Sequence, residues 1–161
     1  MLAAPLASAQ SSLAPETEKC LALRARYDIE TPTSGDRIFA YTEAAHHTTV
    51  EYCTVAWRDA AGLWTVSGAG EESAGLLNIP AAPIKEERRV LSIADGDRID
   101  QLLASNSLYD ETSPKQESAP NVGASFHTIE IVSSHGHQLI HWIGRLKGQT
   151  GEGADLVMGA G

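Results

Sequence analysis

The sequence of 161 residues has the length, composition and charge of an acidic, globular chain. Hydrophobic residues make up 42% and charged residues 20%, which is not the composition of a disordered protein. The 12 Lys and Arg residues against 21 Asp and Glu residues give a formal charge of −9, which argues against nucleic acid and anionic membrane surfaces as partners. The longest uncharged run, residues 1–15, is shorter than the ~20 apolar residues of a membrane span.

Residues 1–18 are predicted to be a disordered segment or the remnant of a signal peptide. Ala7, Ser8 and Ala9 form an A-x-A cleavage pattern after a short apolar stretch, although the first basic residue is Lys19. An Ala-rich disordered tail is the alternative. We expect one domain over residues 19–148, a Gly-rich tail over 149–161, and a periplasmic or secreted location.

Alternation of apolar and polar residues predicts strands in the first half of the chain. Such a pattern covers residues 21–30, 37–42 and 48–57, and a tight turn at 59–62 leads to a return strand over 63–67. In this hairpin Trp57 and Trp64 are expected to be cross-strand neighbours. Residues 68–84, with three Gly and two Pro, are expected to form a long loop, and the charge run over 85–89 a solvated stretch.

The second half is predicted to contain one helix and a second hairpin. Ser92 and Asp95 form a capping pattern, and Ile99, Leu102 and Leu103 an apolar stripe, so residues 92–105 are expected to be helical. After a polar loop over 110–123, strands are predicted at 126–132 and 138–144. This element order predicts an α+β fold, a mostly antiparallel sheet of about five to six strands with one main helix packed on one face.

The register of the second hairpin yields the best candidate for a catalytic pair. If His135 and Gly136 are the two turn residues, Ile129 opposes Trp142 on an apolar face. Glu130 then opposes His141 on the other face, and the carboxylate would hold the imidazole in its charged form. A structural cross-strand contact is the alternative to a catalytic dyad.

The histidines and cysteines are the other residues with chemical potential. His135 and His137 are the candidate metal ligands, but no H-E-x-x-H pattern and no nearby Cys support them, and exposed turn histidines are the alternative. His46 and His47 are interpreted as surface residues of a loop. Cys20 and Cys53 form no C-x-x-C pair, so they are expected either to form one disulfide in an oxidising compartment or to be two buried thiols.

No motif of the sequence specifies a reaction or a cofactor. We therefore expect a small exported bacterial protein that acts as a binding or interaction module without catalysis and without a cofactor. Its partner would be an unidentified protein or small molecule. The first alternative is a metal- or His-dependent hydrolase that uses the histidines of the 127–141 hairpin. The second is a cytoplasmic acidic protein of the immunity or inhibitor type, whose charge complements a basic partner.

Overall fold

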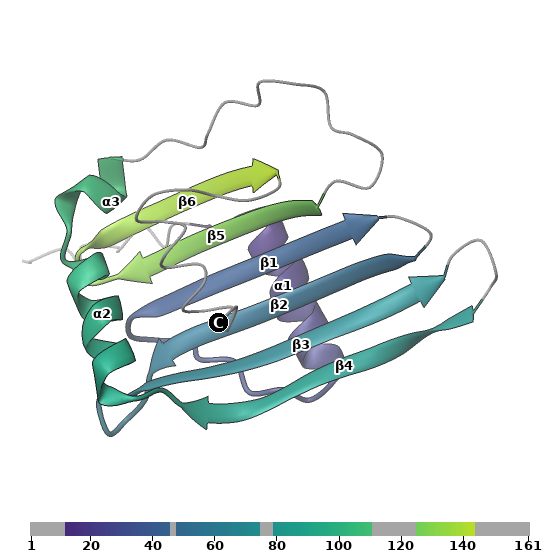
Figure 1. Ribbon diagram of the computed structural model, residues 1–161, viewed down its shortest axis with the longest axis horizontal. Coiled ribbons are helices and arrows are strands. Elements are labelled where there is room, and N and C mark those ends of the chain that lie inside the picture. Colours follow the sequence, from purple (N-terminus) through teal and green to yellow (C-terminus); the bar gives the residue numbers. More distant parts are fainter. Residues whose placement is uncertain (1–11, 46–47, 75–78, 111–124, 144–161) are drawn as a thin grey trace, which may run out of the picture.

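A computed structural model of the chain shows an α+β fold built on an antiparallel sheet (Figure 1). It describes residues 12–45, 48–74, 79–110 and 125–143. The elements in chain order are α1 (Pro15–Arg26), β1 (Arg37–Ala45), β2 (Thr49–Arg58), β3 (Trp64–Ala74), β4 (Ile79–Val90), α2 (Ile93–Leu103), α3 (Asn106–Asp110), β5 (Ser125–Ser133) and β6 (Gly136–Ile143). The six strands lie in the order β4-β3-β2-β1-β5-β6, and every neighbouring pair is antiparallel.

The sheet has a hydrophobic cluster on each face. On one face, which we call the α2 face, helices α2 and α3 pack over one end of the strands. Its buried members are Ile38, Ala40, Ala56, Trp64, Val66, Leu91, Ile99, Leu103, Leu108, Ile129, Ile131, Ile140 and Trp142. On the opposite face, the α1 face, the cluster consists of Cys20, Leu23, Phe39, Tyr41, Cys53, Val55, Trp57 and Ala69. Figure 1 shows α1 behind the sheet and α2 and α3 at its left end. The expectation of one main helix packed on one face is therefore not met. The helix that was expected is α2, with 11 residues, and α1, with 12 residues, lies on the other face.

The strand predicted over residues 21–30 is wrong, because α1 covers most of that segment. The buried positions of α1 are Thr17, Cys20, Leu23 and Arg24, and their spacing of three and four residues is that of one helix face. Pro15 opens the helix, where its missing N–H costs nothing. Helix α1 therefore begins inside the segment 1–18, which was expected to be disordered or the remnant of a signal peptide.

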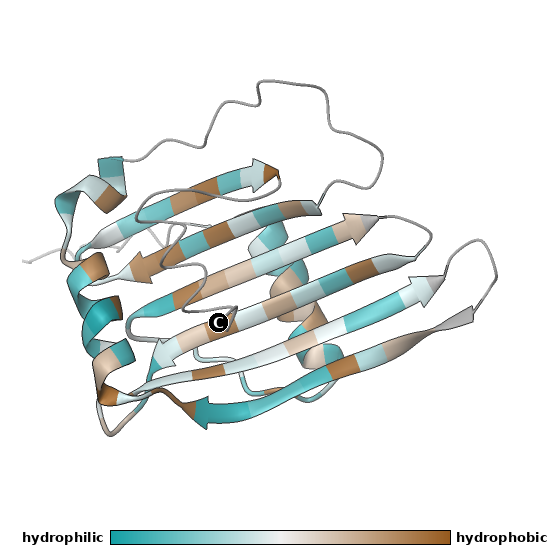
Figure 2. Ribbon diagram, in the orientation of Figure 1, coloured by the Kyte–Doolittle hydropathy of each residue, from teal (hydrophilic) through white to brown (hydrophobic). Residues whose placement is uncertain are grey.

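The long loop predicted over residues 68–84 is also wrong. β3 continues to Ala74 and β4 begins at Ile79, so most of this segment lies in strands. β4 is an edge strand, where proline is tolerated, and Pro83 lies opposite Glu71. The charge run over 85–89 belongs to this strand and appears as its teal half in Figure 2. Charged side chains and proline on an edge strand hinder pairing with other chains.

Trp57 and Trp64 lie on opposite faces of the sheet and are not cross-strand neighbours. Trp57 opposes Thr65 and belongs to the α1-face cluster, whereas Trp64 opposes Arg58 and belongs to the α2-face cluster. The expectation was wrong because the register of this hairpin is one residue away from the register that would pair the two tryptophans, and a shift by one residue places them on opposite faces.

α2 forms as predicted, with one difference in its buried stripe. The Ser92 hydroxyl accepts a hydrogen bond from the Asp95 N–H at 3.1 Å, which caps the helix. Ile99 and Leu103 are buried, but Leu102 is only half-buried, so its assignment to the core is wrong. Ile99 and Leu103 are four residues apart on one helix face, and Leu102 lies at the side of that face.

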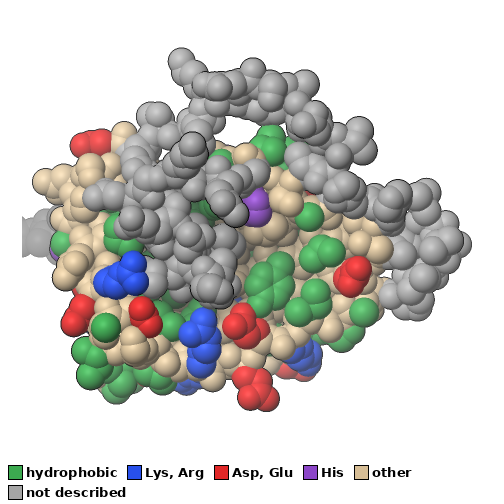
Figure 3. All heavy atoms as spheres, in the orientation of Figure 1, with side chains coloured by type: hydrophobic (Ala, Val, Ile, Leu, Met, Phe, Trp, Pro, Cys, Tyr) green, Lys and Arg blue, Asp and Glu red, His purple; other side chains and the backbone are tan. Residues whose placement is uncertain are grey.

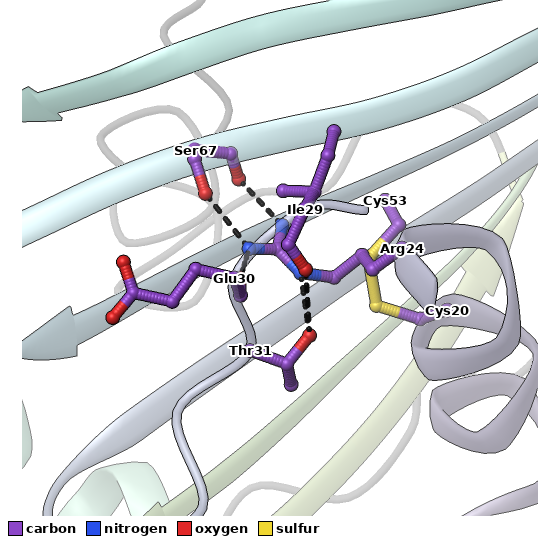
Figure 4. The surroundings of a disulfide bond; sticks show 7 residues. All are labelled: Cys20, Arg24, Ile29, Glu30, Thr31, Cys53 and Ser67. Atoms are coloured by element: carbon purple, nitrogen blue, oxygen red, sulfur yellow. Dashed lines mark hydrogen bonds between the residues drawn. A yellow bond between two sulfur atoms is a disulfide. The ribbon is translucent and has the colours of Figure 1, made fainter. Parts of the chain in front are cut away.

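Cys20 and Cys53 form a disulfide that ties α1 to β2, which confirms the predicted pairing (Figure 4). Their Cα atoms are 5.2 Å apart, and both residues are fully buried. One helical turn further on, the fully buried Arg24 donates to the carbonyl and hydroxyl of Ser67 on β3, at 3.0 and 2.8 Å. It also donates to the Glu30 carbonyl and the Thr31 hydroxyl. α1 is thus fixed to the sheet by one covalent bond and by a buried cation.

Candidate functional site

The second hairpin forms, but its predicted register is wrong by two residues. Ile129 opposes Ile140 rather than Trp142, and Glu130 opposes Leu139 rather than His141. The turn residues are Ser134 and His135, between the paired Ser133 and Gly136. A shift by two residues preserves the faces, so the expected apolar face with Ile129, Ile131, Ile140 and Trp142 is present.

Contacts outside the hairpin explain where the turn lies. The Ser133 hydroxyl accepts a hydrogen bond from the His135 N–H at 3.2 Å and also contacts the Tyr109 hydroxyl at 2.8 Å. A Cβ atom at Gly136 would lie 2.9 Å from the Tyr109 ring. Gly136 therefore allows the close approach of α3 to β6, and the turn forms one position earlier.

The structure brings Glu130 together with His137 instead of His141. Glu130 is fully buried on the α1 face, and its Oε1 lies 2.6 Å from His137 Nε2. Its Oε2 accepts a hydrogen bond from the Ala14 N–H at 3.0 Å. A carboxylate in this position caps the amino end of α1, where the helix dipole favours negative charge. Both oxygens of the carboxylate thus hold the fold together.

The other candidate histidines lie apart from this pair. The cross-strand neighbour of His141 is Thr128, whose hydroxyl contacts His141 Nδ1 at 3.0 Å. His135 is exposed in the turn. Among the described residues, no group of three or more His, Cys, Asp or Glu is placed to hold a metal ion. His46 and His47 lie outside the described residues.

The α2 face carries a second group of side chains, which the sequence did not single out. The register places two rows of residues side by side across the sheet. The first row, from β4 to β6, is Glu86, Gly68, Thr54, Ala40, Ile129 and Ile140. The second row is Ile84, Gly70, Tyr52, Thr42, His127 and Trp142. We call the small residues Ala40, Thr42 and Thr54 in the middle of these rows the floor. Figure 3 looks onto this face and shows hydrophobic side chains gathered over the middle strands.

Tyr52 forms one flank of the floor and leans away from it, over β3. A Cβ atom at Gly68 would lie 2.2 Å from the Tyr52 hydroxyl, and one at Gly70 would lie 2.5 Å from the ring. The phenol donates a hydrogen bond to Glu86 Oε2 at 2.6 Å. Burial, followed by this hydrogen bond, raises the pKa of Tyr52 well above its ordinary value, so the phenol is neutral. Two glycines and a carboxylate thus hold the ring in one orientation.

His127 forms the opposite flank and leans toward β6. Its ring stacks on Trp142 with centroids 5.0 Å apart, and its Nδ1 lies 2.9 Å from the Thr42 hydroxyl. Burial lowers the pKa of His127 below its ordinary value, so the imidazole is neutral at neutral pH. Both flanking rings are thus uncharged and held by neighbours.

Thr54 lies two residues after Tyr52 on β2, opposite Ala40, and its hydroxyl lacks a hydrogen bond of ordinary geometry. The residue is 1% exposed, and the oxygen makes no hydrogen bond of ordinary geometry, although it lies close enough to Tyr52 to lower the pKa of the phenol. A buried hydroxyl without a partner costs about 1–3 kcal/mol. In contrast, Thr65 on the α1 face is equally buried and donates to Asp59 at 3.3 Å. The floor is thus a place where the fold leaves a polar group unsatisfied.

One sequence signal could have pointed to this site. Glycines inside a strand indicate a close approach by another group, and Gly68 and Gly70 were interpreted instead as part of a loop. Tyr52, Thr54 and His127 have no motif of their own, because only the pairing of three strands, β2, β1 and β5, brings them together.

None of the described helices has the length and apolar character to cross a membrane.

Comparisons with known proteins identify no relative of this chain. No protein-family model matches the sequence, and searches of curated proteins and of solved structures find no significant match.

Proposed function

We propose that this protein is a non-catalytic binding module that holds a small, uncharged ligand over the floor of the α2 face. The observation that carries the proposal is the buried hydroxyl of Thr54, which makes no hydrogen bond of ordinary geometry although it acts on the Tyr52 phenol. Thr54 is next to Tyr52 on the same face of β2. Tyr52 is held in place by Glu86, and His127 by Thr42. Preorganised polar groups in a largely apolar setting are the usual make-up of a small-molecule site.

The disulfide supports an oxidising compartment, and we propose that the protein works in the periplasm or outside the cell. Disulfides persist in such compartments and are rare in the cytosol. The bond between Cys20 and Cys53 is consistent with the A-x-A pattern at residues 7–9, which suggests export.

The Glu130–His137 contact supports a structural role more than a hydrolytic one. Catalysis by a carboxylate–histidine pair requires the carboxylate to orient the imidazole toward a reacting group. Here the second oxygen of Glu130 holds the amino end of α1 through Ala14, so the carboxylate has a clear structural task. We therefore place binding before catalysis.

The proposal predicts that Thr54→Val makes the protein more stable and its binding weaker. Valine has nearly the shape of threonine and removes the unsatisfied hydroxyl, so the free energy of unfolding should rise by ~1 kcal/mol. Binding of uncharged probes (cyclohexanol, benzyl alcohol and D-glucose) should weaken at least tenfold where the wild type binds them. Stability is measured by urea unfolding, and binding by NMR shifts of the amides of residues 40–42 and 52–54.

The matched control is Thr65→Val, on the opposite face of the same sheet. This substitution removes the hydrogen bond to Asp59, so it should lower stability and leave probe binding unchanged. If no probe shifts the floor amides of the wild type in a saturable way, or if Thr54→Val leaves binding intact, the proposed site is wrong.

A further inference from the structure

We infer that one corner of the molecule binds a second copy of the chain, so that two copies associate about a two-fold axis. We define this surface, the apolar corner, by the exposed side chains of Leu63, Val90 and Ile93. It lies apart from the floor of the α2 face, so the inference goes beyond the proposed function and does not depend on it.

The apolar corner gathers most of the exposed apolar bulk of the described residues. Of the five large hydrophobic side chains that are exposed there, Leu63 (44%), Val90 (52%) and Ile93 (76%) lie together. The Leu91 N–H donates to the Trp64 carbonyl at 2.8 Å, and each of the three lies within two positions of one of these partners. Figure 3 shows hydrophobic side chains at the lower left, where Figure 1 places the β2–β3 turn and the start of α2. Clustered exposed apolar residues indicate an interaction site, whereas single ones need no explanation.

The corner is held in one conformation by the buried ring of Trp64. The indole N–H donates to Asp100 Oδ1 at 2.8 Å, which ties β3 to α2. The guanidinium of Arg58 lies over the ring at 5.3 Å and pairs with the same carboxylate. A Cβ atom at Gly96 would lie 3.3 Å from the ring, so helix and ring are in close contact. A partner that binds here therefore orders few additional groups.

The charged residues beside the corner are already paired within the chain. These ion pairs are Arg58 with Asp100, Arg88 with Asp59 and Arg89 with Glu86. They form a polar rim around an apolar centre, which is the usual arrangement of a protein interface. The chain as a whole has a formal charge of −9. Two copies thus repel each other less at this corner than an even distribution of that charge would imply.

The exposed side of α2 carries a charge pattern that complements itself. Ile93, Ala94, Asp97 and Arg98 are all exposed, and their spacing places them on one side of the helix. Within the described part of the chain, Asp97 and Arg98 take part in no ion pair. A two-fold axis beside these residues brings Arg98 of each copy next to Asp97 of the other. A two-fold interface uses the same surface twice, so such a pattern favours a second copy as the partner.

The dimer is expected to be weak, because three partly exposed side chains supply much less than the ~800 Å² that each partner contributes to a standard interface. The test is sedimentation velocity of the full chain from micromolar to millimolar concentration. The sedimentation coefficient should rise from that of a monomer towards that of a dimer. Ile93→Gln should weaken this association at least tenfold. Because Ile93 is exposed in the first turn of α2, urea unfolding should show no loss of stability.

Phe126→Gln is the matched control. Phe126 is 47% exposed and opposes Glu43 near the far end of β1, whereas Leu63 lies at the opposite end of the strands. The substitution should leave self-association unchanged. Arg98→Asp should weaken the dimer several-fold, because like charges then meet across the axis. The double variant Asp97→Arg, Arg98→Asp should restore it.

Three outcomes would overturn the inference. A chain that stays monomeric at every concentration forms no such dimer. A dimer that Ile93→Gln and Phe126→Gln weaken equally uses another surface. A dimer that the double charge exchange does not restore lacks the proposed two-fold pairing of Asp97 with Arg98. None of these results affects the binding of probes at the floor, which is measured separately.

Discussion

Tyrosine–glutamate hydrogen bonds recur at the residue scale and give the folded chain a particular response to alkali. Tyr41 donates to Glu51 at 2.9 Å, and Tyr52 donates to Glu86 at 2.6 Å. Burial, followed by the hydrogen bond to the carboxylate, raises the pKa of both phenols well above 10.0. Both phenols thus keep their protons in the folded chain at a pH where an unfolded chain releases them.

We predict that the free energy of unfolding falls as the pH rises above 10. A group whose pKa is raised by folding contributes its full stabilisation below the unfolded pKa, and that contribution is lost as the pH rises toward the folded pKa. Arg24 acts in the opposite direction, because burial lowers its pKa to about 10 and the unfolded chain then binds more protons. The measurement is urea unfolding at a series of pH values, with tyrosinate absorbance as a second readout.

The double variant Tyr41→Phe, Tyr52→Phe isolates the two phenols. It should flatten the decline above pH 10, because only the opposing contribution of Arg24 and those of the other groups are left. An unchanged pH profile would show that the phenols ionise equally in the folded and unfolded chains.

At the element scale, α2 depends on a few buried side chains, and we predict that Leu103→Ala costs ~2–5 kcal/mol of stability. Leu103 is 2% exposed and belongs to the α2-face cluster, so truncation leaves a cavity between helix and sheet. The adjacent Leu102→Ala is the matched control, because Leu102 is half-buried and should lose clearly less. Thermal or urea unfolding of the two variants measures the difference. Equal losses would mean that α2 is rotated from the orientation described here.

Elements with strong local signals could be predicted from the sequence, and elements that depend on distant partners could not. The Ser92 cap and the first hairpin are local, and both were predicted within a few residues. α1 was misassigned because the alternating pattern over residues 21–30 matches a strand. The contacts that hold this segment as a helix against the sheet come from distant residues, Cys53 and Glu130. The turn of the second hairpin was misplaced because Tyr109, on α3, determines the position of Gly136.

The candidate site was the least predictable part, for the same reason. Tyr52 and Thr54 come from β2, and His127 comes from β5. They share one face of the sheet because both strands pair with β1 in a particular register. No spacing along the chain encodes that arrangement. The disulfide could be predicted because two cysteines allow only one intramolecular pairing.

At the scale of the whole molecule, the disulfide stabilises the joint between the two layers of the α1 face. We predict that the double variant Cys20→Ala, Cys53→Ala loses ~3–4 kcal/mol, since the bond closes a loop between residues 33 positions apart. Urea unfolding with and without a reductant measures the loss. The reductant should lower the stability of the wild type once the buried bond becomes accessible, and it should not affect the variant. Equal stability of variant and wild type would contradict this role.

Two attachments of α1, the disulfide and the hydrogen bond to Glu130, also impose an order on assembly during synthesis or translocation. Cys53 follows Cys20 by 33 residues, whereas Glu130 follows Ala14 by 116. A chain that emerges from its amino end thus presents β2 to α1 early and presents the carboxylate that caps α1 only after β3, β4, α2 and α3 have emerged. Contacts at such long range form late and slowly. The amino end of α1 is therefore secured long after the helix has emerged, and until then its first turn is open to proteases and chaperones.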